Sequence, residues 1–255
     1  MKIVVIGAGA AGLLAAGKAA ETADEVVIIE KNDIIGKKLL ITGKGRCNIT
    51  NSADIEDMIG QYPRNAKFLY SALYTFTNDD IIRIIEENGV KTKVERGGRV
   101  FPVSDKSQDV VKALKKYALK SNVSLVHDTV KSLIISDGAV KGVKTSKTSI
   151  TADRVIICTG GKSYPRTGST GDGYKLAKQA GHTIIEPKAS LIPVLTEEKF
   201  VKDIMGLSLR NIKITAFNQK NKKVYSDFGE MLFTDKGVSG PMILSASAHL
   251  RNYEK

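Results

Sequence analysis

The chain begins with an apolar strand that runs into a glycine-rich turn, and this feature most constrains the fold. Residues 2–6 read Lys-Ile-Val-Val-Ile, and residues 7–12 read Gly-Ala-Gly-Ala-Ala-Gly. The pattern predicts a strand, a tight turn and a helix over 10–22, followed by a second strand over 26–29. Glu30 follows that second strand, where its carboxylate is expected to accept hydrogen bonds from a ribose.

The residues of this turn have different tasks in a dinucleotide-binding unit. Gly7 lets the chain leave the strand sharply, Gly9 leaves room for a pyrophosphate, and Gly12 lets the helix pack close to the sheet. Ala10 and Ala11 open the helix, whose free N–H groups and positive dipole end favour phosphates. We therefore expect these five residues to bind an adenine dinucleotide.

Composition restricts the class of protein. The chain has 255 residues, of which 42% are hydrophobic, so it is long enough to bury a large core. Cys47 and Cys158 are far apart, which argues against a disulfide framework and against a dithiol flavoenzyme. His127, His182 and His249 lack the spacing of metal ligands, so no metal site is expected.

Targeting signals are also missing from the sequence. No apolar run approaches the roughly 20 residues that a membrane span needs. The first strand starts at the N-terminus, which leaves no room for a cleaved signal. We therefore expect a cytoplasmic protein without membrane association.

The net charge of +12 raises the question of a polyanionic partner. Four of the lysines, however, fall on the outer face of a helix predicted over 108–121: Lys112, Lys115, Lys116 and Lys120. No base-stacking aromatic motif accompanies them. The sequence thus favours a solvated, lysine-rich surface and disfavours a nucleic-acid partner.

The rest of the chain completes an α/β pattern. Helices are expected over 65–74, 79–88 and 108–121, and a buried strand over 123–126 returns to the parallel sheet. Thereafter short β segments at 130–135, 139–145 and 148–152 predict a three-stranded meander, and an apolar strand over 154–158 ends in Thr159-Gly160-Gly161. Residues 31–64 show no clear periodicity, and residues 191–233 are mostly β-like.

These elements predict a Rossmann-like FAD-binding domain over 1–187, made of a parallel sheet, helices and the meander. A β-rich inserted second domain, incomplete, is expected over 188–255. The meander in place of further βαβ units favours FAD over NAD. The glycine-rich stretch 36–51 supports this, because its amides and basic side chains suit a pyrophosphate and ribityl chain. A solvated basic loop is the alternative interpretation of that stretch.

Several segments together resemble one bacterial group of FAD-binding flavoproteins, the HI0933-like family, also called NAD(FAD)-utilising dehydrogenases. The matching segments are 30–31, 36–48, 98–102, 159–165, 168–173 and 230–241. The run from Gly43 to Asn48 is the most specific of them, and the resemblance extends from Met1 to about Ser247. Family members are longer than this chain, so it resembles a C-terminally truncated member.

The resemblance implies which residues lie at the cofactor. Gly7, Gly9, Ala10, Ala11 and Gly12 are implied at the pyrophosphate, and Glu30 and Lys31 at the adenosine ribose. The others implied at FAD are Val130 at the adenine, Thr159, Gly160 and Gly161 along the cofactor, and Gly36, Lys38, Thr42, Gly43, Gly45, Arg46, Cys47 and Asn48 around the flavin half.

The family also implies an FAD-dependent oxidoreductase that transfers hydride between flavin N5 and a small, hydrophobic organic substrate. NADH or NADPH is the expected transient electron donor. The segment 168–173 is an alternative nicotinamide site, but no apolar strand runs directly into it. Two other functions stay open: a flavin-dependent tRNA-modifying enzyme, and an FAD- or adenine-nucleotide-binding module without activity.

Two side chains are weak catalytic candidates. Cys47 follows Arg46, whose charge would lower the pKa of a nearby thiol. A packing or flavin-contact role is the favoured alternative for Cys47, because it has no partner cysteine. Tyr164 is either a proton donor to substrate or a turn aromatic before Pro165. The sequence specifies neither the substrate nor the oligomeric state.

Overall fold

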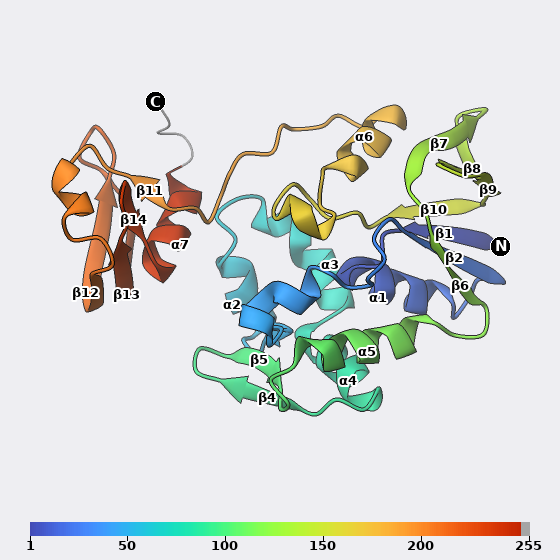
Figure 1. Ribbon diagram of the computed structural model, residues 1–255, viewed down its shortest axis with the longest axis horizontal. Coiled ribbons are helices and arrows are strands. Elements are labelled where there is room, and N and C mark those ends of the chain that lie inside the picture. Colours follow the sequence, from blue (N-terminus) through green and yellow to red (C-terminus); the bar gives the residue numbers. More distant parts are fainter. Residues whose placement is uncertain (251–255) are drawn as a thin grey trace. The chain divides into compact units, whose positions relative to one another are not determined.

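A computed structural model describes residues 1–250, which fall into two compact units. Unit 1 spans Met1–Ile185, and unit 2 begins at Glu186 (Figure 1). Unit 1 contains the whole glycine turn and its surroundings.

A four-stranded parallel sheet forms the centre of unit 1. Its order is β10-β1-β2-β6, with β1 at Lys2–Ile6, β2 at Glu25–Glu30, β6 at Val123–His127 and β10 at Arg154–Ile157. All three pairings are parallel, so the carboxyl ends of the strands share one edge. The predicted return of the segment after residue 122 to the parallel sheet is confirmed.

The sheet is covered on both faces because its two central strands are apolar at successive positions, from Ile3 to Ile6 in β1 and from Val26 to Ile29 in β2. Val5 and Ile28 pack toward α1 (Ala10–Ala19) and α5 (Ser107–Ala118). The alternate residues Val4 and Ile29 pack with Leu133 of the meander on the other face. The meander comprises β7 (Val130–Ser136), β8 (Ala139–Thr145) and β9 (Ser149–Thr151), paired antiparallel (Figure 1). The predicted Rossmann-like architecture is thereby confirmed.

Short elements connect these layers. They are η1 (Leu39–Gly45), β3 (Thr50–Asn51), α2 (Ile55–Gly60), η2 (Ala66–Leu69), α3 (Tyr70–Thr75), α4 (Asn78–Glu87), β4 (Thr92–Glu95), β5 (Arg99–Pro102), η3 (Pro165–Thr167) and α6 (Asp172–Gln179). Thr77 and Asp80 form the capping box that their spacing predicts at the start of α4. Strands β3, β5 and β4 make a small antiparallel sheet.

One local prediction was wrong. The first helix ends at Ala19 rather than near residue 22, because the chain tightens there: the N–H groups of Glu21 and Thr22 bond three residues back. The stretch 31–64 lacks apolar periodicity, yet it contains η1 and α2. These elements are only about two turns long, which is too short to produce a periodic signal.

Unit 2 is an antiparallel sheet with one helix. Its strand order is β11-β14-β13-β12, with β11 at Val194–Leu195, β12 at Ser208–Phe217, β13 at Lys223–Phe233 and β14 at Gly237–Ser239. The turn η4 spans Lys199–Lys202, and α7 (Pro241–His249) packs on β13. The stretch 191–233, expected to be mostly β-like, contains β11, β12 and the continuous strand β13.

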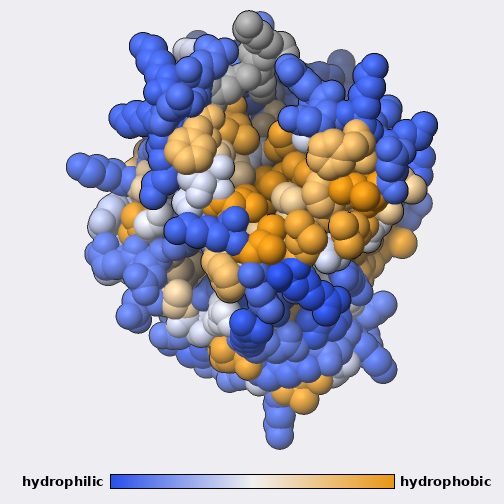
Figure 2. Space-filling model, turned by 90° about the vertical axis from the view of Figure 1, so that its left-hand side faces the viewer, coloured by the Kyte–Doolittle hydropathy of each residue, from blue (hydrophilic) through white to orange (hydrophobic). Residues whose placement is uncertain are grey.

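Unit 2 leaves much apolar surface exposed. Figure 2 shows one face of this unit, and apolar side chains gather on that face. The large exposed apolar residues of the unit include Leu191, Leu195, Phe200, Met205, Leu207, Phe217 and Phe228. Within residues 1–250, no helix combines the length and the hydropathy needed to cross a bilayer.

Candidate dinucleotide-binding site

A cavity of about 360 Å³ opens at the carboxyl edge of the parallel sheet. This is where open α/β folds bind their ligands. It collects the following residues that sequence reasoning assigned to the cofactor: Gly7, Gly9, Ala10, Ala11, Glu30, Lys31, Gly36, Lys38, Thr42, Val130, Thr159 and Gly160. Five separate segments of the chain, at 7–11, 30–31, 36–42, 130 and 159–160, thus meet at one cavity.

The glycine turn supplies the floor of this cavity. Gly7 has a φ of 102°, and a Cβ there would lie 2.5 Å from the carbonyl oxygen of Cys158. A Cβ on Gly12 would overlap the carbonyl oxygen of Gly7. Gly9 differs from both, because a Cβ on it would meet no atom within 4 Å. The absence of a side chain at Gly9 therefore keeps space open above the turn, not within the fold.

That open space fits a pyrophosphate. No side chain caps α1 at its N-cap, Gly9, so the N–H groups of its first turn have no side-chain acceptor there. These groups and the helix dipole attract an anion. The residues present are therefore those that a dinucleotide requires at its phosphates.

Glu30 lies at the end of β2 with only 7% of its surface exposed. Its Oε2 accepts a hydrogen bond from the backbone N–H of Ala8 at 2.7 Å. Its Oε1 accepts from the backbone N–H of Asn32 at 2.8 Å and from Asn32 Nδ2 at 2.6 Å. Three hydrogen bonds thus hold the carboxylate beside the glycine turn.

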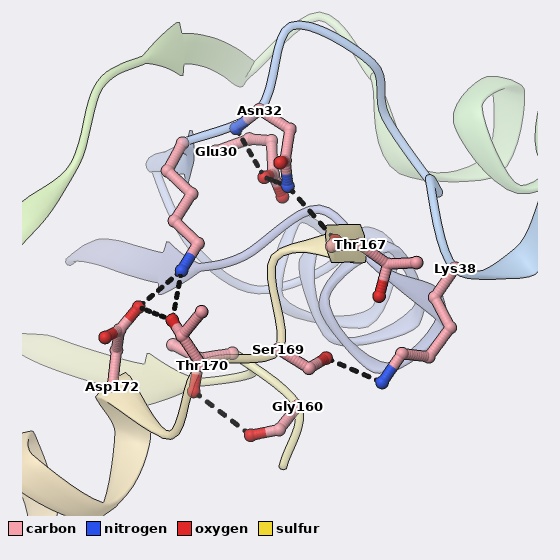
Figure 3. A network of polar contacts seen from close by, with 10 residues as sticks. Glu30, Asn32, Lys38, Gly160, Thr167, Ser169, Thr170 and Asp172 are labelled. Carbon is pink, nitrogen blue, oxygen red and sulfur yellow. Dashed lines mark hydrogen bonds and ion pairs between the residues drawn. The ribbon is translucent and has the colours of Figure 1, made fainter. Parts of the chain in front are cut away.

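Two lysines connect the segment after β2 to residues 163–172, and we call this network the polar clasp (Figure 3). Lys31 Nζ donates to Thr170 Oγ1 at 2.7 Å and to Asp172 Oδ2 at 2.5 Å. Lys38 Nζ donates to Ser169 Oγ at 2.7 Å. Two ammonium groups therefore lie at the cavity that also holds the helix N-terminus.

The clasp also changes the acidity of Asp172. Partial burial favours the neutral carboxyl, but hydrogen bonds from Lys31 and Thr170 outweigh it, so the pKa of Asp172 falls below its usual range. Asp172 opens α6, where a negative charge suits the helix dipole. An ionised Asp172 keeps Lys31 in place at the cavity.

Asp128, Thr129 and Val130 line the end of the cavity next to the meander. The hydroxyl of Ser146 donates to Asp128, which also accepts from the backbone N–H of Thr129 at 2.7 Å. Bonds from the hydroxyls of Ser146 and then Thr145 hold the pKa of Asp128 well below its usual range. This carboxylate fixes the backbone where the meander begins.

Other expected cofactor residues lie outside this cavity. They are Gly12, Gly43, Gly45, Arg46, Cys47, Asn48 and Gly161, none of which lines it. The guanidinium of Arg46 instead donates to both carboxylate oxygens of Glu95, at 2.8 and 3.2 Å, and to Asp105 at 3.2 Å. It lies 4.1 Å from the ring centroid of Phe101. The positive charge of Arg46 is thus paired with the carboxylates of Glu95, in β4, and Asp105.

The two catalytic candidates also lie outside the cavity. Cys47 is 1% exposed in the core, and burial raises the pKa of its thiol. The idea that Arg46 lowers this pKa is therefore wrong, because desolvation dominates and the guanidinium is paired with carboxylates. Tyr164 is 70% exposed, with a φ of 51°, at the start of η3.

Sequence reasoning missed several lining residues: Ala8, Asn32, Asp128, Thr129, Cys158, Thr167, Ser169, Asp172 and Leu176. One group had a signal in the sequence, the glycine-rich segment 168–173, which matches the family and is also the alternative nicotinamide site. The structure places Gly168, Ser169 and Asp172 on the cavity of the first turn. In the described part of the chain, no three His, Cys, Asp or Glu side chains are arranged to hold a metal.

Comparisons with known proteins identify a family that matches nearly the whole chain. Residues 1–247 match the family described as the HI0933-like protein Rossmann domain. A ribosomal RNA dihydrouridine synthase from Haemophilus influenzae is 35% identical over 96% of the chain. A 3-dehydro-bile acid delta(4,6)-reductase from Clostridium scindens is 33% identical over 98% of it. The chain spans 60% of the length of each of these relatives.

Solved structures share the fold at lower identity. The open conformation of a flavocytochrome c3 fumarate reductase aligns with a TM-score of 0.56 and 16% identity. That alignment covers 82% of this chain and 47% of the other. At such identity the likeness concerns the fold alone.

Proposed function

The chain belongs to the HI0933-like flavoprotein family, and on that premise we propose that the cavity of unit 1 binds FAD as part of an oxidoreductase. The observation that carries the proposal is the convergence of an open glycine turn, the Glu30 carboxylate and two lysines on one cavity. The turn would bind the pyrophosphate, Glu30 the adenosine ribose, and the backbone near Val130 the adenine.

The residues of the chain would bind and orient the cofactor. When bound, FAD supplies hydride chemistry at flavin N5. The polar clasp would hold residues 163–172 over the cavity and exclude water from the phosphates. Asp128 would keep the adenine end rigid, so that the dinucleotide adopts one extended position.

We further propose that the reaction is the reduction of a carbon–carbon double bond conjugated to a carbonyl group. The names of the two relatives describe this one chemistry on different molecules, since uridine and a 3-keto-Δ4,6 steroid both contain such a bond. In such a reduction the substrate would gain hydride at the carbon remote from the carbonyl and a proton from solvent at the adjacent carbon. A reduced nicotinamide, NADH or NADPH, would return the two electrons to the flavin.

A small, hydrophobic carbonyl compound is the leading substrate class. The bile acid reductase relative and the exposed apolar surface of unit 2 favour it. Uridine in RNA is the second candidate, favoured by the dihydrouridine synthase relative and by the net charge of +12. A nucleotide-binding module without activity is the third.

Titration of the purified chain with FAD tests the cofactor proposal: we expect saturable binding that quenches flavin fluorescence. Absence of binding at tens of micromolar FAD would contradict it. Anaerobic mixing of reduced, flavin-loaded protein with a Δ4-3-keto steroid or a uridine-rich RNA tests the reaction. Recovery of the oxidised-flavin absorbance with one of them identifies the substrate class. If neither reoxidises the flavin while FAD still binds, the proposed reduction is wrong.

A further inference from the structure

Unit 1 has a second hollow, which shares no residue with the dinucleotide cavity. Its volume is about 490 Å³. One wall consists of residues 88–91, after α4, together with Val103 and Ser104. The other wall is one side of α5, formed by Asp109, Lys112, Ala113 and Lys116. The tertiary structure therefore brings Lys91 opposite two lysines of a helix that starts about 16 residues later.

The side chains that line this hollow carry a net positive charge. Lys91, Lys112 and Lys116 are exposed, and Asp109 is the acidic residue of the lining. The Lys112 ammonium lies 3.8 Å from the Asp109 carboxylate, beyond hydrogen-bond distance. Among the residues that the structure describes, Lys91 and Lys116 have no acidic side chain within ion-pair distance. Three ammonium groups thus face one carboxylate in a concave surface.

Helix stabilisation explains only part of this arrangement. Lys116 lies in the last turn of α5, where a cation interacts favourably with the helix dipole. Lys91 belongs to neither end of α5, and Lys112 lies in its middle. Convergence from two elements across a hollow is instead what an anionic ligand requires.

We propose that this hollow binds the phosphodiester backbone of an RNA strand. Lys112 and Lys116 are one helical turn apart, about 6 Å along the axis, so they reach successive charges of a polyanion. Lys91 contacts the strand from the opposite wall. Lysine binds phosphate as a point charge and reads no sequence, so affinity here would be independent of base identity.

The inference gives the second candidate substrate a place to bind, and in that respect it rests on the proposed function. Binding itself requires neither FAD nor catalysis. RNA affinity and FAD affinity can therefore be measured separately, and failure of one does not imply failure of the other.

Fluorescence anisotropy of the full chain with a short, labelled single-stranded RNA tests the inference. The variant Lys91→Gln/Lys112→Gln/Lys116→Gln is compared with Lys131→Gln/Lys141→Gln/Lys144→Gln, which removes three exposed lysines of the meander. Each lost phosphate contact lowers the salt slope by about 0.7, or about fivefold in affinity at about 0.1 M salt. We expect about a hundredfold loss for the first variant and much less for the second.

Three results would overturn the inference. The first is no RNA binding by the unsubstituted chain at low salt, and the second is an equal loss in both triple variants. The third is displacement of RNA by millimolar inorganic phosphate at constant ionic strength, which would indicate a site for a small anion. Circular dichroism and FAD titration of both variants verify that they fold.

Discussion

The Glu30 carboxylate accepts a hydrogen bond from the backbone N–H of Ala8 at 2.7 Å, and this bond joins the end of β2 to the glycine turn. The acid and the turn are separated by one helix in sequence but act as one unit in space. Because Glu30 also accepts from Asn32, its position is fixed before any ligand binds. Such preorganisation lowers the entropic cost of binding.

Glu30→Gln is expected to weaken FAD binding about tenfold, which corresponds to about 1.4 kcal/mol. The amide oxygen can still accept from Ala8, but the amide NH2 group would face the two donors of Asn32 and could accept no bond from a ribose hydroxyl. Fluorescence titration of FAD measures the effect. Glu25→Gln at the exposed start of the same strand is the matched control, and an equal effect there would refute the assignment.

Gly9→Ala and Gly12→Ala are expected to have different effects: the first weakens FAD binding, and the second lowers folding stability. The added methyl group at Gly9 meets open space, so stability should change by less than about 1 kcal/mol while FAD affinity falls at least about tenfold. The methyl group at Gly12 overlaps the Gly7 carbonyl, so we expect a loss of about 3 kcal/mol in stability. Urea unfolding and FAD titration separate the two effects. Unchanged FAD affinity in Gly9→Ala would exclude a pyrophosphate at this turn.

Asp128 should make folding stability depend on pH. Its pKa is held far below the value of about 3.9 in the unfolded chain, so it contributes stability above that value. The contribution is lost as pH falls through the folded-state pKa. We therefore expect Asp128→Asn to lower Tm at pH 7, and the difference from the unsubstituted chain to shrink as pH falls below about 4. A difference that grows at acid pH would contradict this assignment.

The reactivity of the two cysteine thiols should show whether the cofactor binds in this cavity. Burial raises the pKa of both Cys47 and Cys158, so each should react slowly with N-ethylmaleimide at pH 7. Cys158 is partly exposed and lines the cavity, whereas Cys47 is 1% exposed. Peptide mass spectrometry should therefore find Cys158 labelled first and protected by FAD. Faster labelling of Cys47 would contradict its burial in the core, and no protection of Cys158 would show that the cofactor binds elsewhere.

Sequence patterns predicted the local structure of unit 1 well. The apolar runs of β1 and β2 are covered on both faces, as their lack of polar alternation indicates. Thr77 and Asp80 form the capping box that their spacing predicts. The three-stranded meander was predicted by short β segments between turn residues. These features depend on residues close together in the chain, so their signals survive in the sequence.

Sequence patterns did not predict contacts between residues that are far apart in the chain. Arg46 forms ion pairs with Glu95 and Asp105, which lie some 50 to 60 residues later in the chain. No local sequence pattern predicts these partners. Likewise, burial raised the pKa of Cys47, although its neighbour in sequence is a cation.

The sequence by itself determined the strand, turn and helix that open the chain, together with the carboxylate after β2, because turn chemistry and hydrophobic periodicity are local. Only the tertiary structure decided which residues share a surface. It brought Asp172 and Ser169 to the lysines after β2, and Lys91 to Lys112 and Lys116. The physical reason is that electrostatic and desolvation energies depend on distances in space, which the packing of the whole sheet and its helices sets.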